Sequence, residues 1–284
     1  MSVQDLFRIS VVIFTVSNLL AMGIESNPKE AVMTLRSTRF IALTILWSWV
    51  AGPALAWLIT RIIPMEEPQA AGLLLASMAP TAPFYPLVVR RARGDMDFAA
   101  ALILLATIGT VAFMPFMVPL MTKGFTVTAW VIARPLLIMV LLPLVTGLAL
   151  RLFKPPVADM LFPAVKQTGV IFTLIIAVFI VVLYGREMLG ALGSNAVAAL
   201  LLFLMVMTMA SYKIGFGLKQ EQRSAMSLGM CTRNIAAVFG VYLAIPDPAP
   251  GMFVMLILVV TLTGIFSFIS AVIFARHAGR PIVA

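Results

Sequence analysis

Arg233 is the residue whose type and position point most directly to chemistry. It lies in the polar stretch Cys231-Thr232-Arg233-Asn234, within an apolar segment from about Ser224 to Ile245. Nine residues separate it from Ser224, which at helical rise is about 14 Å, close to half the thickness of a bilayer core. A charge at that depth costs at least about 2.5–3.5 kcal/mol and must face protein or a wet cavity. The alternative is a purely structural role, in which the arginine caps backbone carbonyls of a broken helix.

A second polar interruption lies in the first half of the chain. The run Pro80-Thr81-Ala82-Pro83-Phe84-Tyr85-Pro86 places three prolines inside the apolar segment Gln69–Val89. Each proline removes a backbone donor and clashes with the preceding turn, so a continuous helix is not expected. The freed carbonyls must meet protein or water, because lipid cannot satisfy them. A shift of about 150 residues carries this run onto Met230–Ala236, and matching breaks in two halves of a membrane protein indicate a transport site.

The chemistry predicted for these two breaks is the binding of an organic anion. Helix N-termini favour anions, and a guanidinium carries five donors in a fork that fits a carboxylate or sulfonate. The residues predicted to bind the substrate are Arg233, Asn234, Thr232, Thr81, Tyr85, Ser48 and Asn18. Asn18 and its neighbour Ser17 also fit a role as ordinary interhelical hydrogen-bonding residues, which is the role we favour for them.

Composition defines the class of protein. Hydrophobic residues make up 62% of the chain and charged residues 11%, and the mean hydropathy is +1.09, whereas an average soluble chain is about 25% charged. The chain is therefore predicted to be an all-α integral membrane protein. Its net charge of +9 comes from lysines and arginines at the ends of apolar segments, which fits contact with a lipid bilayer and not with nucleic acid.

Catalytic and metal chemistry are not expected. The chain has one cysteine, Cys231, and one histidine, His277, so a disulfide, a clustered metal site and a Cys-His or Ser-His-Asp set are unavailable or improbable. All eleven acids fall near predicted segment ends or in loops. We therefore predict no enzyme activity and no resident cofactor.

Apolar runs long enough to cross about 30 Å predict nine transmembrane helices. They lie roughly at Asp5–Ile24, Phe40–Ile63, Gln69–Val89, Phe98–Met121, Thr128–Leu152, Leu161–Tyr184, Leu192–Tyr212, Ser224–Ile245 and Gly251–Ala275. The shift of about 150 residues carries 40–121 onto 190–271, and an odd helix spacing inverts the second block, as in inverted-repeat transporters. One transporter domain over 1–284 is thus predicted. It has a six-helix core (about 40–121 and 190–276) with two crossing broken helices, and a three-helix panel (about 5–24 and 128–184).

The distribution of positive charge predicts the orientation. Fourteen lysines and arginines gather at one set of segment ends and five at the other. The positive-inside rule then places the C-terminus in the cytoplasm and the N-terminus outside. The first segment has a poor cleavage site at Ala21-Met22-Gly23-Ile24-Glu25, so it is expected to be a retained helix and not a signal peptide.

Several motifs resemble those of the bile acid:sodium symporter family. They are Ala21-Met22-Gly23-Ile24, Gly52-Pro53-Ala54-Leu55-Ala56-Trp57, Ala92-Arg93-Gly94-Asp95 and Thr232-Arg233-Asn234-Ile235-Ala236-Ala237. The resemblance runs from about Val16 to Ala275 and implies alternating-access transport of an organic anion by a panel and a core of inverted repeats. The chain looks like a divergent bacterial-type member that lacks the first of ten helices. An inner-membrane location is therefore implied.

The chain departs from the family at the residues that the resemblance implies for sodium. These positions hold Ser48, Tyr85, Pro86, Ala99, Ile103, Gly229 and Arg233, and the family residue is kept at Asn234. A hard cation needs several oxygen ligands, usually with a carboxylate. Our hypothesis is that the guanidinium of Arg233 replaces sodium, so that transport is sodium-independent, by uniport or anion exchange.

Two alternatives stay open at this point. In the first, sodium still binds through Thr81, Ser48, Asn234 and backbone carbonyls. In the second, the protein is a membrane sensor that binds an anion without moving it. A steroid acid, a keto acid and a sulfonated metabolite all suit an arginine in a mostly apolar cavity.

Overall fold

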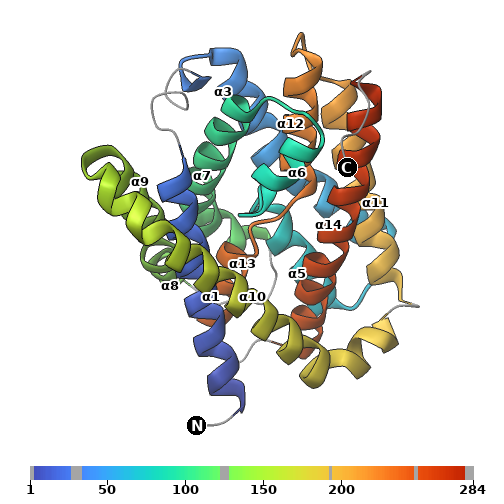
Figure 1. The fold of residues 1–284 in the computed structure, drawn as a ribbon. Helices are drawn as coiled ribbons and strands as arrows, with labels where there is room; N and C mark the ends of the chain where they lie inside the picture. Colours follow the sequence, from blue (N-terminus) through green and yellow to red (C-terminus); the bar gives the residue numbers. More distant parts are fainter. Residues whose placement is uncertain (1–2, 27–33, 122–127, 192–193, 246–248, 279–284) are drawn as a thin grey trace.

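The computed structural model describes residues 3–26, 34–121, 128–191, 194–245 and 249–278 (Figure 1). Regular secondary structure within these ranges is helical. The elements are α1 (Val3–Glu25), α3 (Thr38–Ile45), the π-helix η1 (Leu46–Ala51), α4 (Gly52–Ile62), α5 (Glu67–Ser77), α6 (Tyr85–Arg91), α7 (Met96–Met121), α8 (Ala129–Pro135), the π-helix η2 (Leu136–Leu141), α9 (Leu142–Phe153), α10 (Pro155–Ala191), α11 (Asn195–Lys213), α12 (Gln220–Cys231), α13 (Ile235–Ala244) and α14 (Pro250–His277).

Seven helical stretches in the described residues are long and apolar enough to cross a membrane. They are 5–25, 38–62, 96–120, 129–153, 155–183, 195–213 and 250–277, which coincide with seven of the nine predicted segments. The third and eighth segments are each divided into two shorter helices, α5 with α6 and α12 with α13. Leu192, and the basic residues Lys29, Lys123 and Arg280 used to predict orientation, lie outside the described residues.

The first helix packs along α9 and α10 (Figure 1). Gly23 of α1 faces Gly147 of α9 so closely that a Cβ on either would run into the backbone of the other helix. Small residues of this kind let membrane helices approach closely. Arg151 of α9 donates from Nε to the carbonyl oxygen of Ile24 at 2.7 Å and pairs with Asp159 of α10 at 2.8 Å. These contacts tie the three helices into one group.

The divided helices have different neighbours, because α6 lies between α7 and α14, whereas α13 packs on α8, η2 and α1. Half-helix α5 packs on α14 at Gly72, where a Cβ would lie only 2.8 Å from the Cβ of Met255. Half-helix α12 packs between α11, α7 and α14. Every residue of α12 and α13 from Ser224 to Val241 is buried, so the polar stretch around Arg233 lies in the protein interior and not against lipid.

Two π-helical turns interrupt segments that the sequence predicted as plain α-helix. Each ends just before a proline at the second position of the next helix, Pro53 in α4 and Pro143 in α9. The Gly52 N–H bonds to the carbonyl of Trp47, and the Leu142 N–H to that of Leu137, each five residues back. A proline ring clashes with the carbonyl four residues before it, and the wider turn relieves that clash.

Candidate functional site

The first break is made by prolines. Half-helix α5 ends at Ser77, and α6 begins at Tyr85 with Pro86 in its first turn. A proline at the start of a helix loses nothing, because the first N–H groups have no intrahelical partner. Between the two helices the chain is mostly irregular from Met78 to Phe84, where Pro80 and Pro83 prevent helical hydrogen bonding.

The second break has no proline. Half-helix α12 ends at Cys231, and Thr232 is extended, with φ −89° and ψ 152°. Asn234 then begins α13 as its N-cap residue, because its side-chain oxygen accepts from the Ala237 N–H at 3.2 Å. Asparagine is among the best N-cap residues, and this role explains why a polar residue sits at this depth.

The two breaks bond to each other. The Asn234 N–H donates to the Ala79 carbonyl at 2.8 Å, and the Thr81 N–H donates to the Thr232 carbonyl at 2.9 Å. Together they form an isolated antiparallel bridge between Pro80 and Arg233. The backbone groups that each break releases are thus satisfied by the other break, which is the condition for irregular backbone at membrane depth. We call residues Ala79–Ala82 and Thr232–Asn234 the junction.

Arg233 lies at this junction and is 1% exposed. Its Nη1 donates to the carbonyl oxygen of Ser77 at 3.3 Å, and its Nη2 donates to that of Met230. The guanidinium carbon lies 4.7 Å from the centre of the Phe203 ring on α11, within cation–π range. The Nε–H has no partner among the described residues. The observed contacts are those of an arginine that caps the carbonyls of broken helices.

Thr81 holds an unusual backbone conformation, with φ +70°. A β-branched residue in the left-handed region is strained, and such strain is typical of functional sites. Its N–H is shared between the carbonyls of Gly229 and Thr232, at 3.2 and 2.9 Å. The Thr232 hydroxyl accepts from the Ala82 N–H at 3.2 Å. Thr81 and Thr232 therefore clamp the junction from both sides.

Tyr85 and Ser48 border the junction. The Tyr85 hydroxyl donates to the Ala225 carbonyl of α12 at 2.9 Å, and the Ser48 hydroxyl, in η1, lies 3.7 Å from the sulfur of Met230. Both are buried. Asn18 instead packs against α10, next to Gly169, and its amide donates to the Phe14 carbonyl at 2.8 Å. The structure thus brings six of the seven predicted residues together.

The positions that the resemblance implies for sodium ligands are filled by packing. A Cβ on Gly229 would lie 2.5 Å from Cδ2 of Leu102, and 3.5 Å from both the Thr81 hydroxyl and the Tyr85 ring. A side chain at this position would therefore require Leu102 to shift. Ala99 on α7 is also buried and brings no oxygen. The carbonyls of Ala79 and Thr232 in the junction, and those of Ser77, Gly229 and Met230 beside it, all accept from N–H donors.

Sequence reasoning missed the partners of Arg233. Ser77 and Met230 take part through main-chain carbonyls, and Phe203 lies on a helix that carries no polar signal near that position. In the sequence, only the positions of Ser77 and Met230 pointed to this role, because both residues belong to the last turn of a helix that ends in a break.

Comparison with known proteins supports the motif-based assignment. The sequence profile described as "Sodium Bile acid symporter family" matches residues 12–191. That range includes the second half of α1, the first break and the helices on either side of it. The second break, with Arg233, lies beyond the matched range. A comparison with curated proteins gives no significant match.

Proposed function

The chain belongs to the sodium bile acid symporter family, and on that premise we propose that it carries an organic anion across the membrane without sodium, with Arg233 in the place of the coupling cation. Members of this family are transporters and not enzymes. The observation that carries the proposal is the position of the guanidinium, which bonds to the last-turn carbonyls of both α5 and α12.

Charge balance explains why a cation belongs at that point. A helix C-terminus carries about half a negative charge, so the two ends that meet at the junction together offset about one positive charge. Arg233 supplies that charge as a side chain of the protein itself, so no bound ion is needed. A guanidinium suits this task, because its fork can serve two carbonyls at once. A permanently bound cation would give a carrier that needs no external ion to close its core.

The residues around the junction argue against a bound sodium ion. Sodium binding would require several oxygen ligands, usually with a carboxylate, whereas the junction carbonyls already accept hydrogen bonds and a carboxylate side chain at position 229 would require Leu102 to shift. The guanidinium of Arg233 would also repel a second cation. We therefore favour uniport or anion exchange over sodium coupling through Thr81, Ser48 and Asn234.

The packing of the helices supports the proposed architecture. The seven long stretches and the two divided segments would give nine spans, with α1, α8–α9 and α10 as the panel and the remaining helices as the core. The close α1–α9 contact at Gly23 and Gly147 supports a rigid panel. The proposal also includes an inverted relation between the two breaks. It places the N-terminus outside, the C-terminus in the cytoplasm and the protein in the inner membrane.

Arg233 also remains our candidate for contact with the substrate. The Nε–H of Arg233 is fully buried and donates to no atom of the described residues. Because the junction is buried, an anion would reach this donor only after the core and panel move apart. Thr232 and Asn234 would then be the nearest neutral hydrogen-bonding groups in the sequence.

Uptake into proteoliposomes tests the proposal. The purified full chain is reconstituted and uptake of radiolabelled cholate, pyruvate and a sulfonate anion such as isethionate is measured in sodium buffer and in choline buffer. We expect at least one anion to enter at the same rate in both buffers, and Arg233→Gln to abolish that uptake. Arg134→Gln, which neutralises an exposed arginine on α8, is the matched control. Uptake that disappears in choline would overturn sodium independence.

Counterflow distinguishes a carrier from a sensor. Proteoliposomes loaded with unlabelled anion should accumulate labelled anion transiently if the protein exchanges its substrate. A sensor would bind the same anion, as shown by a shift in unfolding temperature of the purified protein, but would show no counterflow. Binding without counterflow would therefore replace the transport proposal.

A further inference from the structure

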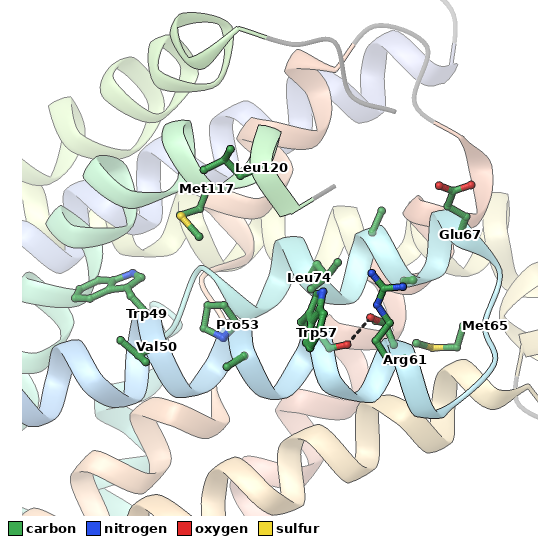
Figure 2. Close-up of a pocket in the computed structure, with 14 residues that line it drawn as sticks. Trp49, Val50, Pro53, Trp57, Arg61, Met65, Glu67, Leu74, Met117 and Leu120 are labelled. Carbon is green, nitrogen blue, oxygen red and sulfur yellow. Dashed lines mark hydrogen bonds between the residues drawn. The ribbon is translucent and has the colours of Figure 1, made fainter. Parts of the chain in front are cut away.

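A pocket separate from the junction lies between η1, α4, α5 and the end of α7 (Figure 2). Its volume is about 720 Å³, within the range of about 300–1,000 Å³ that single small ligands occupy. Figure 2 shows Trp49 and Val50 at one end, and Arg61 with Glu67 at the other. Gly109 of α7 makes room for the Trp49 ring, because a Cβ there would collide with it.

The pocket opens on the surface that faces lipid. Three of its lining residues, Val50, Trp57 and Leu120, are exposed large hydrophobic side chains. In an integral membrane protein such side chains contact acyl chains, so the pocket is open to molecules that arrive from within the bilayer.

The length of the pocket matches one leaflet. Arg61 lies at the end of the 38–62 span, and Glu67 begins the next helix, so both charges belong at the membrane interface. Trp49 lies twelve residues before Arg61 along nearly continuous helix, which at helical rise is about 18 Å deeper, close to half the thickness of the bilayer core. A polar mouth and an apolar floor at these depths fit an amphiphile with a headgroup at the interface.

The two charges at the mouth are of opposite sign and form no ion pair with any described residue. The Arg61 guanidinium lies 5.2 Å from the centre of the Trp57 ring. Both charged side chains are exposed. A ligand with one acidic and one ammonium group would complement both, with its acid at Arg61 and its ammonium at Glu67.

We propose that this pocket binds one zwitterionic phospholipid, with the phosphate at Arg61, the ammonium at Glu67 and one acyl chain along α4 toward Trp49. The lipid would contact η1, α4, α5 and α7, all of which belong to the proposed core. It would therefore lie on the moving part of the protein and not between core and panel. The proposal does not depend on which anion is transported.

Quenching of tryptophan fluorescence by brominated lipid tests this site, because Trp49 and Trp57 line the pocket. The full chain in detergent, with the exposed Trp130 changed to phenylalanine, is titrated with phosphatidylethanolamine brominated in its acyl chains. We expect quenching that saturates at one lipid per chain. Phosphatidylglycerol with the same chains lacks the ammonium group and should bind about tenfold more weakly, the cost of one charge-assisted hydrogen bond.

Three variants in that background locate the lipid. Arg61→Gln should weaken binding of both lipids, Glu67→Gln should remove only the preference for phosphatidylethanolamine, and Ala54→Phe should fill the pocket and abolish saturable quenching. Arg134→Gln is the control and should change nothing. Quenching that never saturates, or that Ala54→Phe leaves unchanged, would overturn the site. Equal affinity for the two lipids when Arg61 and Glu67 are both unchanged would overturn the headgroup assignment.

Discussion

The Nη1 atom of Arg233 lies 3.3 Å from the carbonyl oxygen of Ser77, and this hydrogen bond joins residues 156 positions apart. It connects the break in one half of the chain to the end of a helix in the other half. Because Nη2 of the same guanidinium bonds to Met230, one side chain holds the ends of two half-helices. The junction should therefore respond as a single unit when Arg233 is changed.

Replacing Arg233 should lower stability in an order set by charge and shape. Arg233→Gln removes the charge and leaves buried carbonyls unpaired, which should cost about 2–4 kcal/mol. Arg233→Lys keeps the charge but cannot bond to two carbonyls with a planar fork. Its stability should therefore lie between those of the wild type and Arg233→Gln. Thermal unfolding of the purified protein measures the order, with Arg134→Gln as control. A lysine variant no more stable than the glutamine variant would show that charge at the junction does not matter.

The strain at Thr81 predicts that glycine at this position gives a more stable protein than alanine, the reverse of the usual order. At most positions glycine is less stable than alanine by about 0.5–1 kcal/mol. At φ +70° alanine keeps the steric cost of the left-handed conformation, whereas glycine does not. Thr81→Gly should therefore unfold at a higher temperature than Thr81→Ala. The same pair at Thr107, whose φ lies in the helical range of α7, should show the ordinary order.

The outcome at the two breaks shows what sequence can predict. The prolines between Pro80 and Pro86 predict a broken helix because proline acts on its own backbone, and α5 and α6 are separate where expected. Arg233 could be placed at membrane depth from the length of its segment. Its partners could not be identified, because main-chain carbonyls are the same in every residue, and which ones lie within reach depends on tertiary packing.

Other features depended on packing in the same way. The π-helical turns before Pro53 and Pro143 widen helices that an apolar pattern predicts as regular. Trp49 packs against Gly109 and Phe113 of α7 and also lines the pocket in Figure 2. Hydrophobicity alone does not separate a ring that faces a neighbouring helix from one that lines a lipid-facing pocket.

Asp95 joins the turn before α7 to the start of α12. Its Oδ1 accepts from the Phe98 N–H at 2.9 Å as an N-cap, and its Oδ2 accepts from the Gln222 amide at 3.3 Å. Asp95→Ala should cost about 1–2 kcal/mol through loss of the cap. Asp95→Asn keeps an acceptor oxygen and should cost much less. Unfolding temperatures measure both, and equal losses would show that the negative charge, and not the cap, stabilises this turn.

The contact between Gly229 and Leu102 tests the interpretation of the filled sodium positions. A Cβ on Gly229 would lie 2.5 Å from Cδ2 of Leu102, so Gly229→Ala should destabilise the protein by about 1–3 kcal/mol through overpacking. Leu102→Val removes the colliding methyl group, and Gly229→Ala should cost clearly less in that background. A double-mutant cycle measured by thermal unfolding gives the coupling. Additive losses would mean that the glycine is required for another reason and that space at this position does not limit a larger, oxygen-bearing side chain.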